Sequence, residues 1–209
     1  MYIHRDDILS MNKLPRLNLI NSITGIKPAN LIGTQSTSGD LNLAVFSSVL
    51  HLGSNPALLG FMVRPTKEVP RHTYENIKSQ GVYTINHVHE GLVERAHFTS
   101  AKFERDVSEF EKCDLKPQFI DGFEAPFVEE SLIKIGLELR DEKYIELNGT
   151  IMIIGEIEHI LVEDSIWKTD GHLDLTEANS TGISGLNSYY SVQKISQFPY
   201  ARPKNLPDF

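Results

Sequence analysis

Residues 41–64 carry the pattern that most constrains how this chain can fold. Side chains alternate along Leu41–Phe46 as they do in a strand that presents two different faces. The small hydroxyls of Ser47 and Ser48 then interrupt the pattern, and a Gly-Ser-Asn-Pro turn leads into the apolar run Ala57–Val63. The sequence therefore predicts two strands on either side of a hydroxyl-rich loop.

Positive charge follows the second of these strands. Arg64 ends it, and Arg71 precedes a helix predicted over His72–Gln80, with Thr73 in its first turn. Arginines and the free N–H groups of a helix N-terminus both favour an anion such as a phosphate. We therefore predict an anion-binding site here, while ordinary solvated loop serines remain the simpler interpretation of the hydroxyl loop.

Length and charge exclude several classes of protein. A chain of 209 residues is expected to form one domain, and its net charge of −8 without a basic run argues against nucleic-acid binding. The single cysteine, Cys113, precludes an intrachain disulfide and lies among carboxylates that make it a poor nucleophile. No apolar run reaches the roughly 18 residues of a membrane span, and the N-terminus lacks a signal-peptide pattern. We expect a cytoplasmic protein.

The rest of the chain indicates a mainly β protein with inserted helices. An N-terminal arm, residues 1–27, is expected to dock on the body, with Pro15 preventing one continuous helix. Gly155 lies in the middle of a long predicted strand, as at a barrel corner. We predict a closed, Greek-key-like β-barrel followed by a loop-rich tail over 167–209. Strands are predicted over 31–37, 41–46, 57–63, 82–88, 131–139, 144–147 and 150–162, and helices over 72–80, 92–98 and 106–113, the last capped by Asp106 with Glu109 as its partner.

Two histidines suggest a different kind of site. His87 and His89 are two residues apart at the end of a predicted strand, where they would share a face and could bind a metal. Polar histidines without any ligand are common at such positions, so this hypothesis is the weaker one. No nucleophile or dinucleotide motif stands out, which is typical of proteins that leave the chemistry to a cofactor.

Several short motifs in order resemble the flavin reductase-like family. They are Gly33–Asp40 (GTQSTSGD), Asn42–Ser48 (NLAVFSS), Ser54–Leu59 (SNPALL), Thr73–Ile77 (TYENI), Tyr83–Asn86 (YTIN), Ser100–Lys102 with Asp106–Phe110, and Ile153–Ile157 (IIGEI). Two departures concern the phosphate end: Lys27-Pro28-Ala29 stands where many members have Pro-Arg-Pro, and His72 stands where they have aspartate.

The resemblance implies an FMN-binding split β-barrel that forms a homodimer. It implies that Ala44–Ser48 line the flavin ring, that Arg64, Arg71 and Thr73 hold the phosphate, and that Asn86 and His87 lie beside the flavin. The implied cofactor-binding residues are Ala44, Val45, Phe46, Ser47, Ser48, Arg64, Arg71, Thr73, Asn86 and His87, with no protein-based catalytic residue and no metal ligand.

The implied activity is that of a flavin reductase. NADH or NADPH would give a hydride to flavin N5, and the reduced FMN, or FAD in its place, would pass electrons to free flavin, an acceptor protein or a small substrate. A flavin-binding electron carrier or flavin store without NAD(P)H activity is the alternative.

Overall fold

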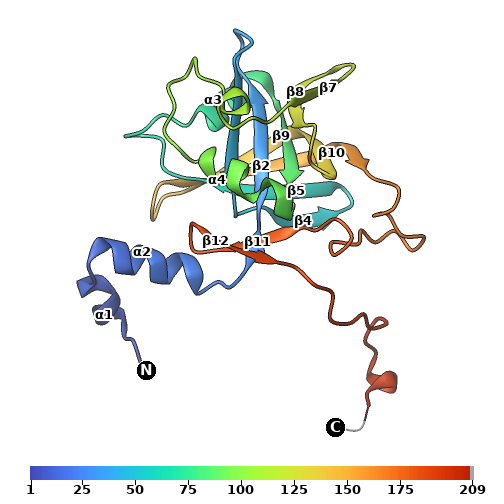
Figure 1. Ribbon diagram of the computed structural model, residues 1–209. Helices are drawn as coiled ribbons and strands as arrows, with labels where there is room; N and C mark the ends of the chain where they lie inside the picture. Colours follow the sequence, from blue (N-terminus) through green and yellow to red (C-terminus); the bar gives the residue numbers. More distant parts are fainter. Residues whose placement is uncertain (208–209) are drawn as a thin grey trace.

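A strongly curled antiparallel sheet of seven strands forms the body of the protein in the computed structural model, which describes residues 1–207 (Figure 1). The strands are β2 (Asn30–Gln35), β3 (Leu41–Phe46), β4 (Leu50–Ser54), β5 (Ala57–Val63), β6 (Val82–His87), β9 (Ile133–Ile145) and β10 (Thr150–Val162). Their order in the sheet is β3-β2-β6-β9-β10-β5-β4. The predicted mainly β fold is therefore confirmed.

The predicted closed barrel is not confirmed. Strands β3 and β4 end the sheet on opposite sides, and no ladder joins them in residues 1–207. The sheet nevertheless wraps around one core, because Ile32 of β2 and Phe61 of β5, far apart in the strand order, belong to the same buried cluster. A second cluster, with Leu43 and Val88, covers the outer face beneath the helices.

The 3₁₀ turn η1 (Glu90–Leu92), α4 (Val93–Phe98) and α5 (Glu109–Lys112) cover part of the outer face, and α5 closes an edge of the sheet. Helix α3 (His72–Gln80) packs on the inner cluster instead, through Ile77. Helix α3 ends at Gln80, as predicted, and Gly81 follows it in a left-handed conformation. The predicted helix over 106–113 is shorter, and Asp106 is not its cap. The carboxyl oxygen Oε2 of Glu109 instead accepts a hydrogen bond of 2.9 Å from the backbone N–H of Leu43 on edge strand β3.

The long strands β9 and β10 pair along their whole length. The two strands predicted over 131–139 and 144–147 are the single strand β9 (Ile133–Ile145), because a register shift opposite Ile154 and Gly155 absorbs one extra residue without ending the ladder. Gly155 is required there because a Cβ atom would lie 2.2 Å from the hydroxyl of Tyr83. That hydroxyl is buried and has no hydrogen-bond partner within residues 1–207.

Three short pieces of sheet were absent from the sequence prediction. Strands β7 (Pro117–Ile120) and β8 (Phe123–Val128) form a hairpin, and β1 (Lys27–Pro28), β11 (Thr181–Ser184) and β12 (Ser188–Ser191) form a small separate sheet. Strand β4 was read as part of a loop. Each is too short, or too mixed in composition, to give a clear alternation.

The two ends of the chain extend from the body on the side of the small sheet (Figure 1). The arm forms α1 (Arg5–Ser10) and α2 (Lys13–Ser22), with Pro15 tolerated in the first turn of α2. No residue of either helix is buried. The end of the arm contacts the small sheet: the Asn21 carbonyl accepts from the backbone N–H of Gly185 at 3.2 Å, and Lys27 pairs with Ile183 of β11. The tail contains β11, β12 and the 3₁₀ turn η2 (Pro203–Asn205). No helix within residues 1–207 is both long and apolar enough to cross a bilayer.

Candidate functional site

The residues predicted to lie beside the flavin ring are placed on two opposite faces of the sheet, because side chains alternate along a strand. Phe46 lies opposite Asn30 of β2, and Asn30 lies opposite His87 of β6, so these three side chains form one row on the inner face of the sheet. Val45 packs instead on the outer cluster, and Asn86 lies on that outer face as well. The structure therefore separates Val45 and Asn86 from Phe46 and His87.

Asn86 has no surface left for a ligand in this structure. Its side chain is completely buried; Nδ2 donates to the carbonyl of Leu31 and to Thr84 Oγ1, and Oδ1 accepts from the backbone N–H of Val128. Thr84 in turn donates to the carbonyl of Pro126 at 2.6 Å. These bonds attach β8 to the sheet, which is a structural role that local sequence does not reveal.

The hydroxyl of Ser48 pairs with the backbone of β5 as a neighbouring strand would. It accepts from the backbone N–H of Met62 at 3.1 Å and donates to the Met62 carbonyl at 3.3 Å. This pairing holds the segment between β3 and β4 against β5. Ser47 is half-buried in the same segment. The edge of β3 that faces away from β2 has backbone N–H groups without a partner strand. The N–H of Leu43 points to this side and donates to Glu109, and the N–H of Val45, two residues on, points to the same side.

Arg64 and Arg71 lie close together without a carboxylate partner. Two causes lower the pKa of the Arg71 guanidinium: its burial, which is the larger, and the nearby positive charge of Arg64. In residues 1–207 neither arginine forms an ion pair, and the one hydrogen bond of Arg71 goes from Nε to the carbonyl of Pro65. Two neighbouring cations without a counter-ion repel each other, and a bound anion would remove this repulsion.

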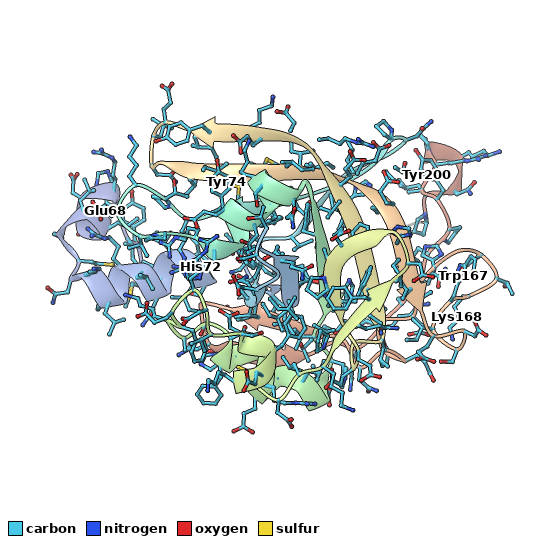
Figure 2. All side chains as sticks on the ribbon, turned by 90° about the horizontal axis from the view of Figure 1, so that it is seen from above. Glu68, His72, Tyr74, Trp167, Lys168 and Tyr200 are labelled. Atoms are coloured by element: carbon cyan, nitrogen blue, oxygen red, sulfur yellow. The ribbon has the colours of Figure 1, made fainter. Side chains whose placement is uncertain are left out.

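The N-terminus of α3 also favours an anion at this place. Arg71 is its N-cap residue and makes no side-chain cap, so the first N–H groups of this nine-residue helix remain available. His72 and Tyr74 mark this end of the molecule in Figure 2, on the side opposite Trp167, Lys168 and Tyr200. The predicted anion site over Arg64, Arg71 and the start of α3 is thus brought together by the fold.

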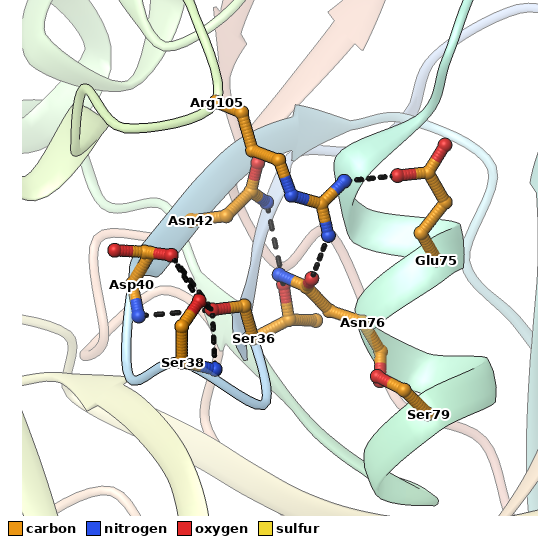
Figure 3. A network of polar contacts seen from close by, with 9 residues as sticks. Ser36, Ser38, Asp40, Asn42, Glu75, Asn76, Ser79 and Arg105 are labelled. Atoms are coloured by element: carbon orange, nitrogen blue, oxygen red, sulfur yellow. Dashed lines mark hydrogen bonds and ion pairs between the residues drawn. The ribbon is translucent and has the colours of Figure 1, made fainter.

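A buried polar network positions Thr73 at this helix start. The amide of Asn42 donates to Thr73 Oγ1 at 3.0 Å and to Thr34 Oγ1 at 3.3 Å, and the amide of Asn76 donates to the same Thr34 oxygen at 3.1 Å. Because Thr73 Oγ1 accepts from Asn42, its own hydroxyl proton is left to donate elsewhere. Arg105 joins the network through Asn76 and Glu75, next to the Ser36–Asp40 turn (Figure 3).

The two histidines do not form the hypothetical metal site. Strand β6 ends at His87, so His89 does not share its face. His89 Nδ1 accepts from the backbone N–H of Gly91, and Nε2 lies 3.2 Å from the carbonyl of Glu130, which uses both ring nitrogens. In the part of the chain that the structure describes, no three histidine, cysteine or acidic residues are placed to hold a metal ion.

Sequence reasoning missed Asn30, Asn42 and Asn76 as parts of the site. Asn42 stands in an alternating strand on the inner face, where an amide among apolar residues is a signal of a buried hydrogen-bond network. Asn76 gains its role from Thr34 and Arg105, and strand pairing places Asn30 between Phe46 and His87, so no local pattern would have identified either residue.

Comparisons with known proteins identify a family and a fold. Residues 26–173 match the family model described as "Flavin reductase like domain". A protein of Methanothermobacter thermautotrophicus is 30% identical over 156 residues, covering 73% of this chain and 71% of its own. A split-barrel protein from Shewanella frigidimarina that carries a flavin reductase name is 45% identical, with a TM-score of 0.92 and coverage of 96% of this chain and 100% of its own. Nitrilotriacetate monooxygenase component B from Bacillus cereus shares the fold at 17% identity, with a TM-score of 0.83 over 95% of this chain and 98% of its own.

Proposed function

Because this chain belongs to the flavin reductase-like family, we propose that it is an FMN-binding oxidoreductase that takes a hydride from NADH or NADPH. The observation that carries the proposal is the pair of unpaired cations, Arg64 and Arg71, at the uncapped start of α3. A phosphate monoester supplies the charge and the acceptor oxygens that these groups lack. Free flavin, an acceptor protein or a small substrate would receive the electrons.

The residues of this chain fit the parts of FMN. Arg64, Arg71 and the hydroxyl of Thr73 would hold the phosphate, with Asn42 fixing the direction of that hydroxyl. The outward backbone edge from Val45 of β3 to Ser47, just beyond the strand, would offer donors to the polar edge of the ring. When bound, the flavin supplies the hydride acceptor and carries the electrons. The protein contributes binding, orientation and the exclusion of water.

A comparison of FMN with riboflavin tests the phosphate site directly. The full chain, stripped of flavin, is titrated with each compound and with FAD while flavin fluorescence is followed. We expect FMN to bind more tightly than riboflavin, and Arg71→Gln to weaken FMN by about 10- to 100-fold, the loss of a charged hydrogen bond, without changing riboflavin. Arg95→Gln is the matched control, because Arg95 already has Glu130 as a partner. Equal affinity for FMN and riboflavin would contradict the proposal.

Anaerobic mixing separates a reductase from an electron carrier. The FMN-loaded protein is mixed with NADH and, separately, with NADPH, and the flavin absorbance is recorded. A reductase loses its flavin absorbance within the mixing experiment with at least one nucleotide. A carrier that binds FMN but keeps its absorbance with both nucleotides, and is bleached by dithionite, is the alternative function.

We also propose that the protein is a homodimer. Arm and tail expose large apolar side chains that a monomer would leave in water: Leu14 and Ile23 of the arm are 67% and 65% exposed, and Phe198 and Tyr200 of the tail 84% and 85%. A second copy is the partner that would cover them. Light scattering should give twice the mass of the 23.6 kDa chain, and deleting residues 1–22 should shift the equilibrium towards monomer. A monomeric full-length chain would refute this.

A further inference from the structure

A carboxylate, Glu75, lies in the first turn of α3, close to the proposed anion site. It comes one helical turn after Arg71, and its backbone N–H donates to the Arg71 carbonyl at 3.0 Å. Side chains four residues apart lie on the same side of a helix, so Glu75 is the nearest carboxylate in the sequence that could pair with Arg71. Such a pair would occupy the arginine and would place a negative charge where an anion has to bind.

Glu75 is paired with a different arginine, Arg105, which lies in the segment between α4 and α5. Nη1 of Arg105 forms an ion pair with the Glu75 carboxylate, and Nη2 donates to Asn76 Oδ1 at 3.4 Å. Figure 3 shows the guanidinium making both contacts from one position. The carboxylate of α3 that is nearest to Arg71 in the sequence is therefore held by a residue 30 positions further along the chain.

Other carboxylates around α3 are also engaged. Hydrogen bonds from Ser38 and Ser36, and to a smaller extent the positive charge of Arg105, hold the pKa of Asp40 below its usual range. Glu142 of β9 lies 3.2 Å from the ammonium of Lys78 and accepts from the hydroxyl of Tyr74 at 3.1 Å. Negative charge is thus present near the helix, and it is compensated by groups other than Arg64 and Arg71.

The fold positions Arg105 through α5, which follows it by four residues. Glu109 of α5 accepts from the backbone N–H of Leu43, and Phe110 is buried in the same cluster as Leu43. These contacts hold the start of α5 against β3. The next residue of that strand, Asn42, belongs to the polar network that ends at Thr73. Arg105 therefore reaches α3 from a segment that is fixed to the strand beside it.

We propose that Arg105 is a positioning residue of the anion site, because it holds the Glu75 carboxylate away from Arg71 and so leaves Arg71 free to bind a phosphate. This inference rests on the proposed function, in which the phosphate is that of FMN. Arg105 itself does not touch the flavin in this proposal. Without it, Glu75 would compete with the phosphate for Arg71 and would repel the bound anion. Arg105 and Glu75 are both partly exposed, so their pair contributes little to folding stability.

The affinities for FMN and riboflavin measure this effect, because only FMN carries the phosphate. The full chain, stripped of flavin, is titrated with each compound at low ionic strength while flavin fluorescence is followed. Arg105→Gln should weaken FMN binding about three- to tenfold and leave riboflavin binding within about twofold of the parent protein. Glu75→Gln, added to Arg105→Gln, should restore the FMN affinity, because the competing charge is then gone. Arg105→Lys keeps the positive charge and should retain most of the FMN affinity.

Arg95→Gln is the matched control, because it removes an arginine from an ion pair with Glu130 that does not involve α3. It should leave both affinities unchanged. The loss caused by Arg105→Gln should also shrink when the ionic strength rises from about 0.01 M to about 0.5 M, as expected of a screened charge and not of a damaged fold.

Two results would overturn the role of Arg105: a loss that Glu75→Gln does not restore, or a loss that is the same for Arg105→Lys and Arg105→Gln. A parent protein that binds FMN and riboflavin equally well would remove the proposed function, and this inference with it. A parent protein that prefers FMN, together with an Arg105→Gln protein that prefers it to the same degree, would refute only the role of Arg105.

Discussion

Replacing His87 by glutamine should make the protein less sensitive to acid. The folded chain holds the pKa of His87 at about 4, against about 6.5 for an exposed histidine, because burial opposes the charged ring. Between these values the unfolded chain binds a proton that the folded chain does not. The free energy of unfolding therefore falls as the pH drops through this window, and it is fully retained above it.

The size of the effect follows from the two pKa values. For one group with these values, linkage predicts a loss of about 2–3 kcal/mol of unfolding free energy between pH 7 and pH 4.5. Glutamine does not titrate, so the His87→Gln protein should lack this loss while sharing every other pH effect. The difference between the two proteins isolates His87.

Urea denaturation of the flavin-free proteins at pH 7, 6, 5 and 4.5, followed by far-UV circular dichroism, measures the effect. His51→Gln is the matched control, because His51 is exposed on β4 and should behave like the parent protein. The stability curves of the parent and the His87→Gln protein should converge, or cross, on acidification. Curves that remain parallel from pH 7 to 4.5 would refute the assignment of a neutral buried His87.

Two further predictions concern folding stability and are measured by chemical denaturation. Gly155→Ala should lower the free energy of unfolding by about 2 kcal/mol, because the new Cβ atom would meet the Tyr83 hydroxyl. Tyr83→Phe should leave the stability unchanged or raise it, and it should remove part of the loss when combined with Gly155→Ala. A double variant that shows the full loss would contradict the contact. Glu109→Ala should lower the free energy of unfolding by about 1–3 kcal/mol, because it leaves the backbone N–H of Leu43 without an acceptor. Glu109→Gln keeps an acceptor oxygen and should lower it less. Equal losses for the two variants would argue against this hydrogen bond.

The sequence predicted those parts of the fold that are encoded by neighbours in the chain. Alternation identified β3, an apolar run identified β5, the helix predicted over 72–80 ends where α3 ends, and the glycine at 155 marked an irregularity in a long strand. The grouping of Arg64, Arg71 and the start of α3 was predictable for the same reason, since they lie within a few residues of one another. Strand β4 and the strands of the hairpin β7–β8 are too short, or too mixed in composition, to leave such a pattern.

The remainder depends on contacts between distant segments. Along Leu41–Phe46 both faces carry apolar residues, because both faces of β3 are covered, and so the pattern could not tell Val45 from Phe46 by the face each occupies. The role of Asn86 depends on β8, more than 40 residues away, and the reason for Gly155 lies in Tyr83 on β6. Such partners become visible only once the strands have been placed side by side.

The carboxyl group of Glu109 also bears on how separate molecules meet. An outer strand normally presents free N–H groups on which a strand of another molecule can add, which is a common start of aggregation. At Leu43 this position on β3 is already filled by Glu109 from a helix of only four residues, α5. A foreign strand approaching at Leu43 would have to displace a buried hydrogen bond before it could form one of its own.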